Sequence, residues 1–143
     1  MVCAFFGNRY ITEDIEEILR DKIREMITVY GVDIFYVGTH GKFDFFVRNA
    51  LMEMSKEFEC IKYYTVLSRV PTRDNGYENP ILPDGIELVP ARAGIVFRNN
   101  WMLKKADYVV AYVKYRGASE SAHLIELADK QGKIVFNLYD YFS

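Results

Sequence analysis

The stretch Ile34-Phe35-Tyr36-Val37-Gly38-Thr39-His40-Gly41-Lys42-Phe43-Asp44 contains an apolar run, a turn with two glycines and the start of a helical pattern. The run is rich in strand-forming residues, and apolar residues recur every three or four positions from Phe43 to Phe58. The turn therefore joins a strand to a helix. In a parallel sheet such turns lie at the carboxyl edge, where glycines admit a ligand and a helix N-terminus offers N–H groups to an anion.

Two other turns repeat this arrangement. Phe6-Gly7-Asn8-Arg9 and Arg116-Gly117-Ala118-Ser119-Glu120-Ser121 each follow an apolar run and lead towards a helical pattern. Runs without polar alternation are typical of strands that are buried on both faces of a sheet. The chain contains five such runs: Val2–Phe6, Ile34–Val37, Ile61–Leu67, Tyr108–Val113 and Ile134–Leu138.

Helical patterns alternate with these strands. We predict helices from Thr12, as N-cap, to Gly31, from Phe43 or Asp44 to Phe58, over about Ala91–Lys105, and over about Ser119–Lys130. The alternation predicts an α/β fold: a single-domain, Rossmann-like, doubly wound parallel sheet of about five strands with helices on both faces, covering residues 1–143.

One segment breaks the alternation. Residues 69–90 contain all four prolines and show no sustained period. A loop of this length in a compact domain is usually a functional lid or ligand wall, or else flexible.

Composition narrows the functional classes. The chain has 143 residues, enough for one domain, and its 50% hydrophobic and 15% aromatic content is typical of a compact soluble protein. A net charge of -2 gives no general reason to bind nucleic acid, which would require a local basic patch. No apolar stretch approaches the roughly 18 residues of a membrane span, so we expect a cytoplasmic protein without a targeting segment.

The cysteines and histidines predict no metal site. Cys3 and Cys60 lie in or beside apolar runs, and we expect both to be small buried hydrophobes in a reducing compartment. His40 and His123 are the two histidines, and no cluster has a zinc-binding spacing.

The first turn offers a phosphate ligand. Gly7 permits a close turn, Asn8 supplies an amide, and the guanidinium fork of Arg9 grips a phosphate at two points. The alternative is an ordinary strand-to-helix turn with a solvent-facing arginine.

The second turn resembles an anion cradle without matching a Walker loop or a GxGxxG fingerprint. Gly38, Thr39 and Gly41 precede a helix N-terminus. Asp44 either caps that helix or contacts a ribose hydroxyl or a base. His40 is either an acid or base or a surface loop residue.

The segment 90–102 concentrates arginine, asparagine and tryptophan. Arg92 lies near the start of the predicted helix, while Arg98 and Asn99 are placed to reach a phosphate or carboxylate, with Trp101 on the same face as Arg98. The alternative is an amphipathic helix with solvated arginines and a partly buried tryptophan.

The third turn combines small residues with hydroxyls. Gly117, Ala118 and Ser119 could surround a phosphate with main-chain N–H groups, although Ser119 is equally suited to be a simple N-cap. Glu120 is a carboxylate near the expected crevice, and Glu126 inside the helix is better explained as a solvent-face residue. No GxSxG elbow is present, which argues against a serine hydrolase.

These residues resemble the SLOG superfamily, which groups DprA-like and LOG-like Rossmannoid domains. The opening is similar to the CxFFGHR motif of small bacterial members, with Asn8 in place of the usual histidine. The similar positions span nearly the whole chain: Cys3-Ala4-Phe5-Phe6-Gly7-Asn8-Arg9, Phe35-Tyr36-Val37-Gly38 with Gly41 and Phe43-Asp44, Pro90 with Arg92, Arg98-Asn99, Trp101-Met102, Asp107-Tyr108-Val109-Val110 leading to Gly117-Ala118, and Asn137-Leu138.

The resemblance implies a fold that binds a nucleotide or nucleotide derivative across the turns after the first, second and fourth strands. LOG enzymes cleave the N-glycosidic bond of nucleoside monophosphates with an arginine and a glutamate. Arg98 matches the arginine, whereas alignment of the third turn puts His123 where that glutamate falls, with Glu120 close by. DprA-like DNA handling would need a basic, aromatic groove that this sequence does not supply.

Three hypotheses follow. The first is a sensing or regulatory module for a nucleotide or ADP-ribose-like ligand, with no cofactor required and with homo-oligomers possible. The second is a phosphoribohydrolase that uses Arg98 and Glu120. The third is a ligand-free interaction protein whose 10 Phe and 11 Tyr supply an interface.

Overall fold

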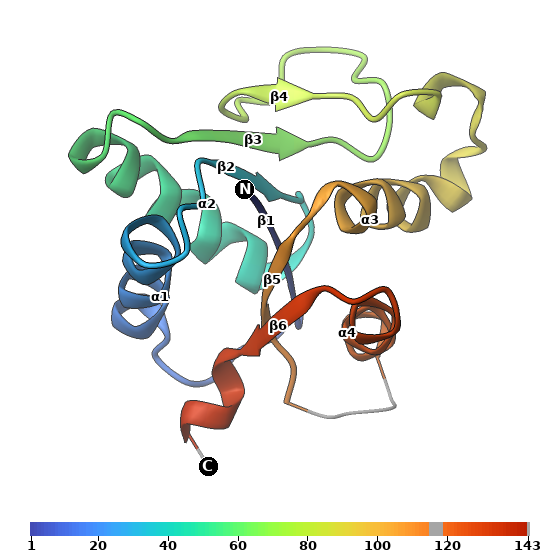
Figure 1. Ribbon diagram of the computed structural model, residues 1–143. Helices are drawn as coiled ribbons and strands as arrows, with labels where there is room; N and C mark the ends of the chain where they lie inside the picture. Colours follow the sequence, from blue (N-terminus) through green and yellow to red (C-terminus); the bar gives the residue numbers. More distant parts are fainter. Residues whose placement is uncertain (115–118, 143) are drawn as a thin grey trace.

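Six parallel strands form one sheet in the computed structural model, which describes residues 1–114 and 119–142. The strand order is β4-β3-β2-β1-β5-β6 (Figure 1). This confirms the predicted α/β, Rossmann-like doubly wound sheet. The strands are β1 (Val2–Gly7), β2 (Ile34–Val37), β3 (Lys62–Val66), β4 (Pro80–Ile81), β5 (Tyr108–Tyr112) and β6 (Ile134–Asn137).

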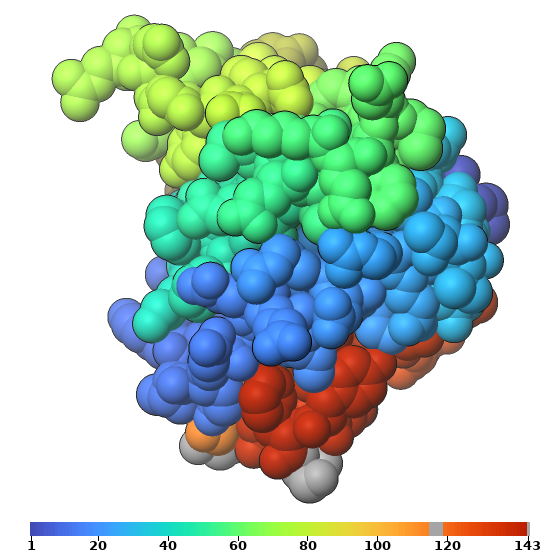
Figure 2. Space-filling view, turned by 90° about the vertical axis from the view of Figure 1, so that its left-hand side faces the viewer, coloured from blue at the N-terminus to red at the C-terminus, as the bar shows by residue number. Residues whose placement is uncertain are grey.

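The strand that the sequence analysis missed is β4. Its two residues lie inside the segment 69–90 and pair in parallel with Thr65 and Val66 of β3. Two residues are too few to produce a periodic signal, and a strand that begins with Pro80 is tolerated because it lies at the sheet edge. Figure 2, which looks at the α1 and α2 side, shows the yellow-green part of the chain around β4 standing out at the top of the molecule.

The helices cover both faces of the sheet, as predicted. Figure 1 shows α1 and α2 on one side and α3 and α4 on the other. Their bounds are α1 (Glu16–Thr28), α2 (Gly41–Glu57), α3 (Gly94–Lys105) and α4 (Glu120–Lys130), and the short 3-10 helices are η1 (Ile86–Leu88), η2 (Ala91–Ala93) and η3 (Leu138–Phe142).

The alternation of side chains along β1 builds two cores. Cys3 and Phe5 pack in the cluster with α1 and α2, whereas Ala4 and Phe6 pack in the cluster with α3 and α4. All four side chains are at most 4% exposed. A central strand that is apolar on both faces therefore fixes the position of its carboxyl end between the two helical layers.

Several predicted boundaries and one predicted burial were wrong. The helix α1 begins at Glu16, because the hydroxyl of Thr12 donates to Glu13 instead of capping the helix. The third helix is divided into η2 and α3, and Gly94 begins α3 where its backbone contacts the carbonyl of Ser68. Cys60 is exposed, since it lies in the turn between α2 and β3.

The reversal of strand order positions the site. The chain runs from β1 outward through β2 to β4, then returns to add β5 on the other side of β1. The turns after β1 and β5 leave the sheet towards opposite helical layers, which opens a crevice at their carboxyl ends. None of the helices within the described residues has the length and apolar character needed to cross a membrane.

Candidate functional site

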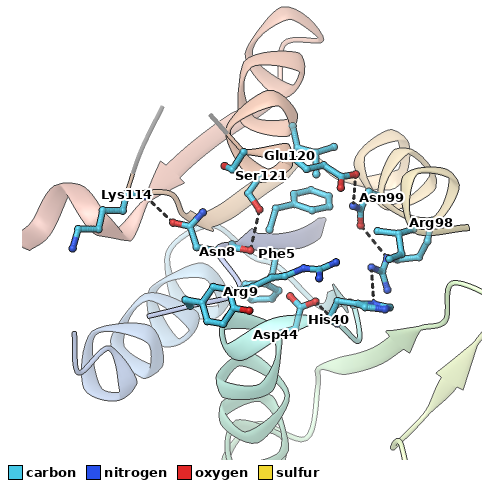
Figure 3. Close-up of a pocket in the computed structure, with 17 residues that line it drawn as sticks. Phe5, Asn8, Arg9, His40, Asp44, Arg98, Asn99, Lys114, Glu120 and Ser121 are labelled. Atoms are coloured by element: carbon cyan, nitrogen blue, oxygen red, sulfur yellow. Dashed lines mark hydrogen bonds between the residues drawn. The ribbon is translucent and has the colours of Figure 1, made fainter. Parts of the chain in front are cut away.

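A cavity of about 400 Å³ opens in this crevice (Figure 3). The sheet and both helical layers contribute to it. Its walls come from the end of β1 and the turn after it, the start of α2, α3, and the first turns of α4. The lining residues are Phe5, Phe6, Gly7, Asn8, Arg9, Tyr10, Gly38, His40, Asp44, Ile95, Arg98, Asn99, Lys114, Ser119, Glu120, Ser121 and Leu124.

Arg9 brings a positive charge into the cavity. Its backbone is held by the start of α2, because the N–H of Lys42 donates to the Arg9 carbonyl at 2.9 Å. Gly41, with φ +91°, lies against this backbone so closely that a Cβ there would be 2.7 Å from the Arg9 Cα. Figure 3 shows the guanidinium reaching into the space between α2 and the helices α3 and α4. With the described residues it makes no side-chain hydrogen bond or ion pair.

Arg98 enters from α3 and is 2% exposed. Its Nη1 donates to Thr39 Oγ1 at 3.1 Å and to the Val66 carbonyl at 3.2 Å, and its Nε donates to Asn99 Oδ1 at 2.9 Å. Burial lowers the pKa of Arg98, which the nearby carboxylates counteract. The side chain therefore ties α3 to the turn after β2 and to the end of β3.

A chain of polar contacts continues from Arg98 along one wall. Asn99, whose Oδ1 accepts from Arg98, donates through Nδ2 to Glu120 Oε1 at 3.3 Å. Glu120 is an exposed residue at the start of α4. Arg98 and Glu120 are thus connected through Asn99 at the cavity wall.

Asp44 is a buried carboxylate that lines the cavity from α2. Its Oδ2 accepts the backbone N–H of His40 at 3.1 Å, which satisfies a donor at the helix start. Burial raises the pKa of Asp44 to about 6, although the charge of Arg98 opposes the shift. A Cβ on Gly38 would lie 2.8 Å from Asp44 Oδ2 and 2.9 Å from Arg98 Nη1, so only glycine fits between them.

His40 is surrounded by arginines. Its pKa is lowered first by burial and then by the charges of four arginines: Arg98, Arg9, Arg48 and Arg69. The ring is therefore neutral at neutral pH. Its Nδ1 lies 3.0 Å from Thr39 Oγ1 and 3.5 Å from Arg98 Nη2.

The opposite wall is tied to β1. Ser121 donates from Oγ to the Gly7 carbonyl at 2.9 Å, and Asn8 Oδ1 accepts the backbone N–H of Lys114 at 2.9 Å. Ser119 is the N-cap of α4, its Oγ accepting the N–H of Ala122 at 3.1 Å. Lys114 also donates to Glu13 Oε2 at 3.3 Å.

The structure separates the candidate residues into groups. Gly7, Asn8, Arg9, Gly38, Asp44, Arg98, Asn99, Ser119 and Glu120 line the cavity. Thr39 and Gly41 do not line the cavity but contact residues that do. Thr39 Oγ1 accepts a hydrogen bond from Arg98, and Gly41 packs against the backbone of Arg9. Gly117 and Ala118 lie outside the described residues.

Arg92 and Trp101 do not line the cavity. Arg92 is exposed on η2, and Trp101 packs edge-on against Tyr36, with ring centroids 5.2 Å apart. Sequence reasoning did not select Tyr10 or Lys114, whereas Ser121 carries one of the two hydroxyls expected of the third turn. Lys114 was the most accessible to prediction, since it follows an apolar run as Arg9 does.

No family model matches the chain, and no curated protein matches it. Within residues 1–114 and 119–142, no cluster of three or more histidine, cysteine or acidic side chains could hold a metal ion.

Proposed function

We propose that this protein binds a nucleotide or nucleotide-derived small molecule in the cavity at the carboxyl ends of β1 and β5, in a sensing or regulatory role. The observation that carries the proposal is the guanidinium of Arg9. It stands in the cavity without a hydrogen bond or ion pair to any described side chain, so its donors are available to a ligand.

The remaining chemistry of the cavity fits such a ligand. A guanidinium binds a phosphate through two parallel hydrogen bonds, and the capped N-terminus of α4 favours negative charge nearby. Phe5, Phe6, Ile95 and Leu124 add apolar surface suited to a nucleobase. The volume falls within the range of small-molecule sites, roughly 300–1,000 Å³. The resemblance to SLOG domains agrees with this reading.

Isothermal titration calorimetry with AMP and with ADP-ribose tests the proposal. We expect wild-type protein to bind at least one of them and Arg9→Ala to weaken that binding. Arg92→Ala is the matched control, because it removes an arginine outside the cavity. Absence of heat with either nucleotide, or equal losses in the two variants, would contradict the proposal.

A second candidate function is hydrolysis of the N-glycosidic bond of nucleoside monophosphates. The contact chain from Arg98 through Asn99 to Glu120 favours it, since it connects a cation and a carboxylate at the cavity. In that reaction water adds to the anomeric carbon, the base leaves with a proton, and Glu120 assists the attacking water. Release of free base from AMP, abolished in Glu120→Gln, is the expected result; its absence from wild-type protein excludes this candidate.

The open cavity favours a ligand over the third hypothesis, an interaction protein that uses the fold without a small molecule. Such a protein has no need for a cationic cavity.

A further inference from the structure

The first turn of α2 and the residue before it place a hydrogen-bond acceptor and a donor on the same wall of the cavity. The acceptor is Asp44, which is 7% exposed. One of its oxygens, Oδ2, accepts from the backbone of His40, and no ion pair joins the carboxylate to a described cation. A desolvated carboxylate in this state gains most from a further donor that a ligand supplies.

The donor is the ring of His40, whose protonation is set by its neighbours. The guanidinium of Arg98 has hydrogen-bond donors and no acceptor, and its Nη2 lies 3.5 Å from His40 Nδ1. Thr39 Oγ1 already accepts from Arg98 Nη1, so its own proton is available to Nδ1 at 3.0 Å. Because Nδ1 receives donors from both sides, the proton of the neutral ring resides on Nε2.

This assignment gives Arg98 a role distinct from that of Arg9. Three of its donors are taken by Thr39, Val66 and Asn99. It acts as a positioning residue that fixes the tautomer of His40, while Arg9 keeps its donors for the ligand.

We propose that Asp44 and His40 recognise the vicinal hydroxyls of a ribose, which makes the ligand a ribonucleotide and not a deoxyribonucleotide. This rests on the proposed binding function. Each ribose hydroxyl both donates and accepts, so one hydroxyl donates to Asp44 and its neighbour accepts from His40 Nε2. An anionic group is repelled by Asp44 and attracted to the guanidinium of Arg9.

Loss of one hydroxyl is costly in such a site. A deoxy analogue removes the ligand donor to the buried Asp44 carboxylate, which then keeps the His40 N–H as its hydrogen bond among the described residues, and a charged acceptor left short of a donor costs more than a neutral hydrogen bond contributes. We expect 2′-deoxy-AMP or 3′-deoxy-AMP to bind about 10- to 100-fold more weakly than AMP.

The experiment is a calorimetric comparison of AMP, 2′-deoxy-AMP and 3′-deoxy-AMP on the full chain. Asp44→Asn and Asp44→Ala are measured beside wild-type protein, with Arg92→Ala as the control that retains discrimination. We expect the difference between AMP and at least one deoxy analogue to shrink to less than about threefold in both Asp44 variants. Asp44→Asn keeps an acceptor for the His40 N–H, so it remains informative if the alanine variant does not fold.

Two outcomes overturn the proposal without touching the proposed function. One is equal binding of all three nucleotides by wild-type protein, and the other is discrimination that persists in the Asp44 variants. If none of the three nucleotides binds, this proposal fails; if ADP-ribose also fails to bind, the proposed function fails too.

Discussion

The turn after β1 and the helix α3 each bring one arginine to the same cavity, in opposite states. Arg9 is exposed and makes no side-chain hydrogen bond or ion pair with the described residues, whereas Arg98 is 2% exposed and donates to three protein acceptors. The comparison teaches that the presence of an arginine in a cavity does not make its charge available. Internal partners decide whether it supports the fold or meets a ligand.

The largest expected effect on stability comes from replacing Arg98, the buried arginine of the two. Arg98→Met leaves acceptors on Thr39, Val66 and Asn99 without their donor and should lower the free energy of unfolding by about 4 kcal/mol. Urea denaturation measures the loss, with Arg92→Ala expected within about 0.5 kcal/mol of wild type. If Arg98→Met matches the wild-type stability, the structural assignment of this arginine is wrong.

Asp44 makes the free energy of unfolding depend on pH. The folded pKa of about 6 exceeds the ordinary value of 3.8, so the folded state holds a proton that the unfolded state has already released. Stability from this group is fully present below the unfolded pKa and is lost as pH rises from about 4 through about 6, a change of about 3 kcal/mol.

The measurement is the difference between the unfolding free energies of wild-type protein and Asp44→Asn across that range. Subtraction removes the contribution of other carboxylates, such as Asp33, whose pKa is lowered. A difference that stays constant with pH contradicts the predicted titration of Asp44.

Arg9→Ala should give the reverse pattern to Arg98→Met. We expect its unfolding free energy to stay within about 0.5 kcal/mol of wild type, because no described side chain loses a partner. The nucleotide that stabilises wild-type protein should bind about 30-fold more weakly, a loss of about 2 kcal/mol. Thermal unfolding with and without nucleotide measures both quantities. If Arg9→Ala is destabilised but is still stabilised by the nucleotide as wild-type protein is, the proposed difference between Arg9 and Arg98 is wrong.

The smallest expected change in stability concerns the Tyr112 hydroxyl, a polar group that neither supports the fold nor lines the cavity. Tyr112, paired in register with Gly7 just before the Arg9 turn, is 0% exposed, and its hydroxyl has no hydrogen-bond partner among the residues that the structure describes. Tyr112→Phe removes this unsatisfied group and should raise stability by about 1 kcal/mol. Calorimetric unfolding tests the sign. A decrease in melting temperature would mean that the hydroxyl has a partner.

The sequence predicted the layers because long apolar periods determine them. Five strands and four helices carried clear patterns, and the alternation implied that their turns meet at one edge. The two-residue β4 carried no period, and the start of α1 depended on which partner the Thr12 hydroxyl takes.

The different burial of the arginines could not be predicted from the sequence in the same way. Arg92 and Arg98 lie six residues apart in one segment, yet one is exposed on η2 and the other is buried against Thr39. Helical spacing places residues on a face, but the neighbour that fills that face is set by tertiary packing. Trp101 illustrates this, since Tyr36 on a distant strand decides its position.

The hydrogen bond from the Lys42 N–H to the Arg9 carbonyl has a thermodynamic consequence. It attaches the turn that carries Arg9 to the helix start that carries His40 and Asp44. The three side chains are therefore mounted on a single backbone unit, so their relative placement is settled during folding. A ligand that touches all three then loses less binding free energy to ordering the protein, which is the benefit of preorganisation.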